Sequence, residues 1–143
     1  MYLAINGSTD YLKAPTSINY DKWVIDCYID GTLPRHQYII GSNNIILRIN
    51  ANTTSLFDNQ INQTGFTTGA RTTITLTATG GAENSNVGIF GDGTNSTKGK
   101  IYSIKIYHGG VLKTYYNMNT GTLVDQSGNG NNGTLVGGTW MTE

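Results

Sequence analysis

The sequence predicts an all-β protein, folded as a two-sheet antiparallel jelly-roll sandwich, and two observations lead to that prediction. Thr, Gly and Asn together make up more than a third of the 143 residues, whereas proline occurs only twice. Thr favours pleated surfaces, and Gly and Asn favour turns that need a positive φ. Short segments in which apolar and polar residues alternate recur along the chain, separated by turn-forming residues about every 8–12 residues. No segment has a convincing helical period.

The alternating segments give the expected strands. The clearest is Asp21–Asp30, in which the odd-numbered positions from Trp23 to Ile29 are apolar while the even-numbered positions form a second face. In chain order, the expected strands are Tyr2–Ile5, Tyr11–Ala14, Asp21–Asp30, Gln37–Ile40, Ile45–Ile49, Ser55–Asp58, Asn62–Thr67, Arg71–Thr79, Val87–Phe90, Ile101–Tyr107, Val111–Met118, Thr134–Val136 and Thr139–Met141.

Turn residues suggest how two pairs of strands connect. We expect a hairpin between the first two strands, which are joined by the turn formers Asn6–Asp10, and a second hairpin about His108–Gly110. The strand Ile101–Tyr107 alternates strictly, which places Tyr102 on the same face as Ile104.

Length and charge limit the class of protein. Residues 1–143 are expected to form a single domain, because no linker or repeat is visible. Nine basic residues balance nine acidic ones and no basic run occurs, so nucleic acid is not an expected partner. No apolar run is long enough for a membrane span, and residues 1–6 do not have the features of a signal peptide. Cys27 is the only cysteine, so no internal disulfide is expected.

Four segments resemble a known family. Ile5–Leu12 (INGSTDYL) and Trp23–Ile29 (WVIDCYI) are similar to a hairpin and the strand that follows it in that family. Asp125–Leu135 (DQSGNGNNGTL) is similar to its Ser-Gly-Asn-Gly-Asn loop, and Gly99–Tyr107 (GKIYSIKIY) to a strand near its end. The family is the concanavalin A-like, laminin-G-like jelly roll, and the resemblance spans nearly the whole chain.

The order of these segments differs from the usual one, in which the Ser-Gly-Asn-Gly-Asn loop comes first. Here the loop follows every other segment, which implies a circular permutation and requires adjacent N- and C-termini. We therefore expect the strand around Trp140 to lie beside Tyr2–Ile5 or one strand away. This order resembles a type found in phage and prophage virion proteins. The resemblance implies a place on the virion surface, on capsid, tail or fibre, and contacts with other virion proteins.

The sequence does not predict an enzyme. The nearest match to the paired carboxylates of glycoside hydrolases is Asp26 and Asp30, four residues apart on one strand. At about 3.3 Å per residue they lie roughly 13 Å apart. Retaining glycosidases need about 5–5.5 Å and inverting ones about 6.5–9.5 Å. His36 and His108 lie in separate loops with no nucleophile pattern beside them.

The best candidate for a carbohydrate-binding surface is the polar face of the third strand. Asp26, Tyr28 and Asp30 combine carboxylates with an aromatic ring. Tyr38 and Trp140 are further candidates and Tyr102 could join them, although a place in the core fits each of these three equally well. Sugars are recognised by aromatic faces next to groups that form hydrogen bonds.

Two aspartates in Gly-rich loops are candidate calcium ligands, since laminin-G-like domains often bind calcium through an Asp and loop carbonyls. These are Asp92 and Asp125. The segment from Asp125 begins like a calcium loop, but Val136 stands where a bidentate Glu is needed. Asx-turns that cap tight loops explain both aspartates equally well.

Three functions are therefore open. The first is a non-catalytic virion module that adheres to a glycan on a host or environmental surface. The second is a purely structural virion protein that decorates or assembles the particle, with exposed strand edges that pair with other copies as a homo-oligomer. The third, a glycan-degrading enzyme, is disfavoured by the carboxylate spacing.

Overall fold

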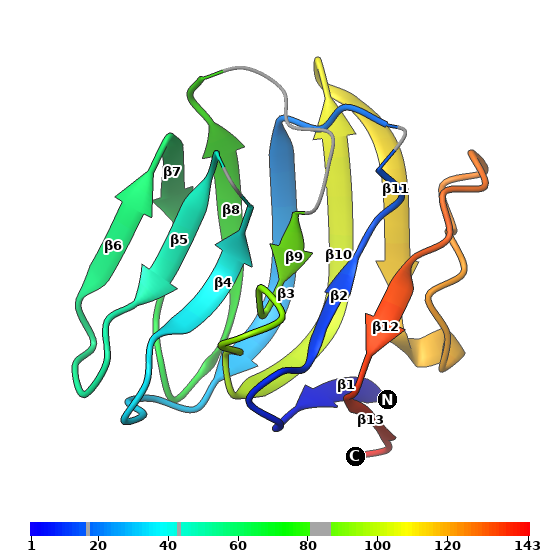
Figure 1. Cartoon of the computed structure of the whole chain (residues 1–143). Helices are drawn as coiled ribbons and strands as arrows, with labels where there is room; N and C mark the ends of the chain where they lie inside the picture. Colours follow the sequence, from blue (N-terminus) through cyan, green and yellow to red (C-terminus); the bar gives the residue numbers. More distant parts are fainter. Residues whose placement is uncertain (17, 43, 81–86) are drawn as a thin grey trace.

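Two antiparallel β-sheets pack face to face, which confirms the predicted all-β sandwich (Figure 1). The computed structural model describes residues 1–16, 18–42, 44–80 and 87–143. Each expected strand is present, with ends shifted by a few residues at most. Within the described residues the helical structure is limited to one short 3-10 helix, η1 (Met118–Thr120), so that part of the chain holds no helix able to cross a membrane.

Sheet A contains the longer strands. Its spatial order is β13 (Thr139–Met141), β1 (Tyr2–Ile5), β10 (Gly99–His108), β3 (Lys22–Ile29), β8 (Arg71–Ala78) and β7 (Ile61–Thr64). The strand β11 (Val111–Asn117) pairs with the second half of β10 through the expected hairpin. The order in sheet B is β12 (Thr134–Val136), β2 (Tyr11–Lys13), β9 (Gly88–Ile89), β4 (Gln37–Gly41), β5 (Ile46–Ile49) and β6 (Leu56–Asn59).

The hydrophobic core fills the space between the sheets. As expected from the alternation, every second residue of β3 from Trp23 to Ile29 is buried, while Asp26 and Tyr28 point outward. Sheet B contributes buried side chains such as Leu47. Burial, together with the nearby charge of Asp26, raises the pKa of Cys27 to about 12. Cys27 therefore stays a protonated thiol, which is a poor nucleophile.

The first two strands do not form the expected hairpin. β1 pairs with β10 and β13 in sheet A, whereas β2 pairs with β12 and β9 in sheet B. Residues 6–10 instead carry the chain from one sheet to the other, and the Gly7 N–H donates to Asp10 Oδ2 at 2.8 Å within this crossing. The crossing lets Leu3 and Leu12 enter the core from opposite sheets, and both are fully buried. A two-strand hairpin in one sheet would not reach both sides of the core.

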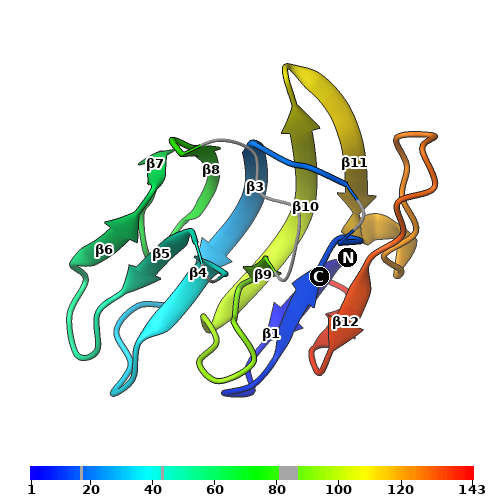
Figure 2. The same cartoon turned by 45° about the horizontal axis from the view of Figure 1, so that its top comes forward.

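The last two strands cross between the sheets in the same place as the first two, and each pairs with one of them. β12 lies beside the N-terminal strand β2 (Figure 2). β13 pairs with β1, with Leu3 opposite Trp140. The expected pairing of the strand around Trp140 with Tyr2–Ile5 is therefore present. Gly137, between β12 and β13, has a φ of 68° and approaches the Asp10 carboxylate so closely that a Cβ would collide with it.

Candidate functional site

A β-bulge in β10 creates the main polar site of sheet A. Opposite β3, Ile101 pairs with Cys27 and Ser103 pairs with Asp26, so Tyr102 is an extra residue without a partner. The strict alternation expected for this strand is therefore wrong. A bulge adds one residue to one strand and redirects the side chains around it. As a result, Ile101 and Ile104 are both buried, and Tyr102 lies on the outer face.

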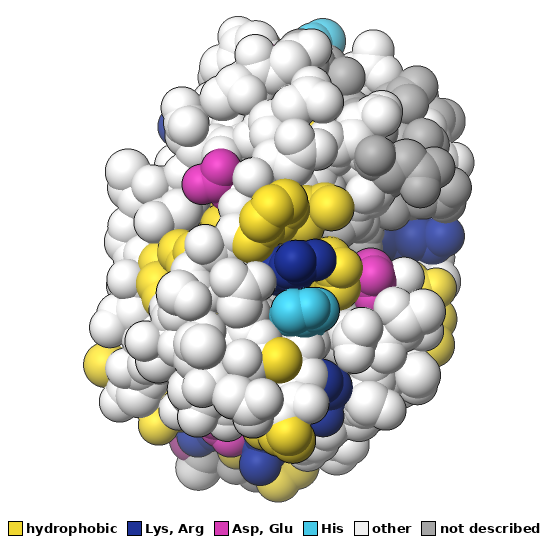
Figure 3. All heavy atoms as spheres, turned by 60° about the vertical axis from the view of Figure 1, so that its left-hand side comes forward, with side chains coloured by type: hydrophobic (Ala, Val, Ile, Leu, Met, Phe, Trp, Pro, Cys, Tyr) yellow, Lys and Arg dark blue, Asp and Glu magenta, His cyan; other side chains and the backbone are white. Residues whose placement is uncertain are grey.

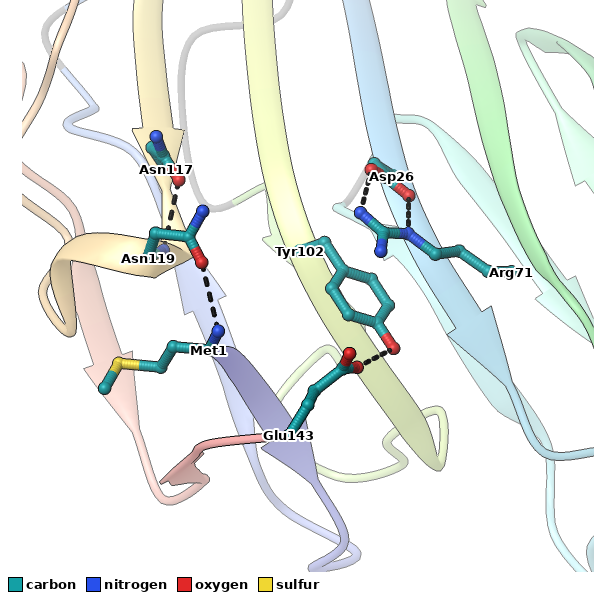
Figure 4. A network of polar contacts seen from close by, with 7 residues as sticks. All are labelled: Met1, Asp26, Arg71, Tyr102, Asn117, Asn119 and Glu143. Atoms are coloured by element: carbon teal, nitrogen blue, oxygen red, sulfur yellow. Dashed lines mark hydrogen bonds and ion pairs between the residues drawn. The ribbon is translucent and has the colours of Figure 1, made fainter.

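A groove of about 310 Å³ lies on the outer face of sheet A at this bulge. Figure 4 shows side chains of β3, β8, β10 and β11 around it, together with the first and last residues of the chain. Charged, amide and hydroxyl groups dominate its lining, which consists of Met1, Asp26, Arg71, Tyr102, Ser103, Tyr115, Asn117, Asn119 and Glu143.

One side of the groove is an ordered chain of charged and aromatic groups. Arg71 Nε and Nη2 donate to the two carboxylate oxygens of Asp26 at 2.9 and 2.8 Å. The guanidinium lies 3.6 Å from the ring centroid of Tyr102, whose hydroxyl donates to Glu143 Oε1 at 2.9 Å. A bidentate, stacked arginine has little freedom to rotate, so these groups have fixed positions on the sheet.

The ionisation of this chain follows from its contacts. The hydrogen bond to Asp26 is the main cause that raises the pKa of Arg71 above its already high value. Burial, followed by the hydrogen bond to Glu143, raises the pKa of Tyr102 to about 12. At neutral pH the groove therefore presents a guanidinium and a neutral phenol. The ion pair is partly exposed, which limits its stabilisation to about 1 kcal/mol or less.

The other side of the groove consists of amides at the end of β11. Asn117 caps η1, because its Oδ1 accepts the N–H of Asn119 at 3.1 Å. Asn119 Oδ1 in turn accepts from the main-chain nitrogen of Met1 at 3.0 Å. The side-chain NH₂ groups of both asparagines have no acceptor among the described residues and can donate to a ligand (Figure 4).

Of the residues predicted on the third strand to bind carbohydrate, one lines this groove and two lie outside it. Asp26 lines it. Tyr28 points outward from the same face, but the Nζ of Lys100 lies 5.4 Å from its ring centroid. Asp30 lies just beyond the end of β3 and forms an ion pair with Lys98 at 3.6 Å. Of the three, only Asp26 belongs to the groove.

The two remaining carbohydrate candidates lie elsewhere. Trp140 packs against the hydrophobic core, opposite Leu3. Tyr38 lies on sheet B, where Arg48 Nη1 donates to its hydroxyl at 3.3 Å and where Arg48 also stacks on Phe57 at 4.5 Å. Figure 3 shows this side of the molecule, with apolar side chains gathered around a basic one. The structure thus does not bring Tyr38 and Trp140 together with Asp26.

Asp125 is bound by its own loop and by β11. Its Oδ1 accepts the N–H groups of Tyr115 and Ser127, and its Oδ2 accepts the Ser127 hydroxyl and the Asn131 N–H, all within 2.9 Å. Burial alone would raise the pKa of Asp125, but these hydrogen bonds outweigh it and lower the pKa. A carboxylate has about four acceptor positions. All four of them hold the loop against β11.

Asp92 forms the Asx-type turn that the sequence allowed. Its Oδ1 accepts the N–H groups of Thr94 and Asn95 at 2.9 and 2.8 Å. Asp92 and Asp125 lie on different loops, and no group of three or more His, Cys, Asp or Glu side chains suited to a metal occurs among the described residues. The structure therefore gives neither aspartate a set of carboxylate partners.

Several groove residues were not anticipated from the sequence. Arg71 begins a Thr-rich strand, and only the β3–β8 register, with Tyr28 opposite Arg71, brings it beside Asp26. The strict alternation expected for β10 placed Tyr102 on the face of Ile104 and left it open between core and binding surface, and Glu143 lies outside every strand. The sequence did point to the groove through Asp26, which is a carboxylate on the outer face of a central strand.

Comparison with protein-family models, curated proteins and solved structures finds no match to this chain.

Proposed function

We propose that this protein is a non-catalytic, carbohydrate-binding module of a phage or prophage virion surface. The observation that carries the binding part is the polar groove at the Tyr102 bulge. It combines a fixed guanidinium, amide groups and tyrosines on a rigid sheet, which are the groups that recognise sugar hydroxyls. The virion part rests on the order of the segments, in which the Asp125–Leu135 loop follows all the others, because this order resembles a type found in phage and prophage virion proteins.

The same contacts argue against glycoside hydrolysis in the groove. A glycosidase needs one carboxyl that gives a proton and a second that acts as base or nucleophile. Asp26 receives two hydrogen bonds from the permanently charged Arg71, and Glu143 accepts the hydroxyl of Tyr102. Neither carboxylate is arranged as a proton donor, so the groove is built to hold a ligand.

A matched pair of arginine variants tests this proposal. Arg71→Ala removes the centre of the groove, and Arg48→Ala removes an equally stacked arginine from sheet B. On a glycan array followed by calorimetry, we expect Arg71→Ala to lose about tenfold or more in affinity while Arg48→Ala binds like the parent. Far-UV circular dichroism checks that both variants fold. Equal affinities would move the site away from the groove, and no binding by the parent protein to any glycan would refute the proposal.

A structural role in the particle is the second candidate, because apolar side chains are exposed on edge strands. Phe57 of β6, Val136 of β12 and Met141 of β13 are each about 40% exposed. Exposed edges can pair with other strands. Stable attachment to virion subunits, together with an empty glycan array, would favour this role.

A further inference from the structure

Three lysines on the outer face of sheet A lie directly opposite tyrosines of the neighbouring strand. We name this surface the lysine–tyrosine face. Its pairs, with the distance from Nζ to ring centroid, are Lys100–Tyr28 (5.4 Å), Lys105–Tyr115 (5.0 Å) and Lys22–Tyr107 (5.2 Å). Lys100 also lies 4.9 Å from the ring of Tyr2. A tyrosine ring attracts a cation to its face, so each ammonium is held beside the sheet.

The lysines of this face are not neutralised by carboxylates. Within the described residues the ion pairs are Arg71–Asp26 and Lys98–Asp30. The other carboxylate of the groove, Glu143, accepts a hydrogen bond from a tyrosine. Asp21, beside Lys22 in sequence, accepts the N–H of Gly109. Lys22, Lys100 and Lys105 thus form no ion pair among the described residues, and their charges are available to a ligand.

These cations follow the length of β10 and pass the groove. Lys100 and Lys105 stand at either side of the bulge, and Lys22 lies opposite Tyr107. At about 3.3 Å per residue, the row from Lys100 to Tyr107 extends roughly 23 Å along the strand. Arg71 lies over Tyr102 between the two ends of the row. An extended ligand that fills the groove must therefore meet positive charge on both sides.

The occupied ring faces decide the class of ligand. Neutral sugars gain affinity by stacking on bare aromatic faces, but the rings of Tyr28, Tyr102, Tyr107 and Tyr115 each have a cation over them. A ligand gains more here from anionic groups that meet the cations. We propose that the groove and the lysine–tyrosine face bind an acidic polysaccharide. This inference rests on the proposed carbohydrate binding and specifies its ligand.

The two carboxylates of the groove, Asp26 and Glu143, favour a sugar polymer over a nucleic acid as the ligand. A nucleic-acid strand carries a phosphate about every 3.4 Å. Such a strand would press phosphates against Asp26 and Glu143, which both line the groove. A polysaccharide with one carboxylate in each disaccharide can place its charges at the lysines and its hydroxyls at the groove.

The test compares one polymer with and without its charge. The full chain is titrated with hyaluronan, which has one carboxylate per disaccharide, and with carboxyl-reduced hyaluronan, which has the same backbone without the charge. We expect the reduced polymer to bind about tenfold more weakly, and added salt to weaken only the binding of the charged one. The variant Lys100→Glu/Lys105→Glu should lose the binding of hyaluronan. The control variant, Lys13→Glu/Arg48→Glu, changes the net charge by the same amount but on sheet B, and it should still bind hyaluronan.

Other outcomes overturn the inference in distinguishable ways. Equal binding of both polymers, or array binding confined to neutral glycans, would refute the acidic ligand and leave the proposed function standing. An array with no binding at all would remove both. Binding of a DNA duplex as tight as that of hyaluronan, lost in Lys100→Glu/Lys105→Glu, would assign the face to nucleic acid instead.

Discussion

The guanidinium of Arg71 lies 3.6 Å from the ring centroid of Tyr102, and Tyr102 is the extra residue of a bulge opposite Asp26. In this sequence Tyr102 reaches the outer face because β10 holds one more residue than β3 at this point. Without the bulge, Tyr102 would share a face with Ile104 and point into the core. A local irregularity of one strand thus creates the groove.

Deletion of Ser103 tests the role of the bulge. The shortened strand keeps Ile101, Ile104 and Ile106 on one regular face, so the core is preserved, and we expect the melting temperature to change by less than about 5 °C. In the shortened strand Tyr102 takes the position opposite Asp26 and stays on the outer face. The ring-current shift that Tyr102 imposes on the Arg71 side-chain protons should therefore remain in the NMR spectrum, and its loss would show that the bulge itself positions the ring. Unfolding of the deletion variant would show instead that the bulge is required for the fold.

The Asp125 loop should be a strong determinant of stability. Asp125→Ala leaves three buried or half-buried backbone N–H groups and one hydroxyl without their acceptor. We expect a loss of about 2–4 kcal/mol in the free energy of unfolding, measured by urea denaturation. The control Asp92→Ala, in an exposed turn, should cost less than about 1 kcal/mol. Equal losses would contradict this difference between the two loops.

The same carboxylate predicts how stability depends on pH. The pKa of Asp125 is lower in the folded chain than its unfolded value of about 3.9. The resulting stabilisation is fully present above that unfolded value and is lost as the pH falls through the lower, folded pKa. Urea midpoints measured from pH 7 down to pH 2 should therefore drop below about pH 4. In Asp125→Asn this drop should be smaller, and an unchanged profile would exclude Asp125 as its source.

A substitution at Gly137 tests the close contact between the turn that joins β12 to β13 and Asp10, which lies just before β2. Its φ of 68° is left-handed, and a Cβ would collide with the Asp10 carboxylate. Gly130, with a φ of 74°, has nothing within 4 Å of its Cβ position. Gly130→Ala should cost about 1–2 kcal/mol from the backbone alone. Gly137→Ala should cost clearly more by thermal unfolding, and equal costs would show that the Asp10 contact relaxes freely.

Removal of calcium should leave the protein unchanged. Four donors, three from its own loop and one from β11, occupy the Asp125 carboxylate. A metal that binds only the folded state raises its melting temperature. We therefore expect the same melting temperature in EDTA as in millimolar calcium. A higher value in calcium would mean that a metal replaces some of these donors, and Asp125→Asn would then abolish the difference.

The sequence by itself determined where the strands lie and, away from the bulge in β10, which of their faces is buried. In β3, alternation separated the buried Trp23 from the outward Asp26, and the structure has the same arrangement. This succeeds because successive side chains of a strand point to opposite sides, which is a local property of the backbone.

Only the tertiary structure decided which strands meet and in what register. It placed β1 and β2 in different sheets, added the bulge at Tyr102 and set Arg71 beside Asp26. These outcomes depend on competition between segments far apart in sequence, and a bulge of one residue leaves no local signal. The sandwich is therefore readable from the pattern of the chain, whereas the groove follows from its register.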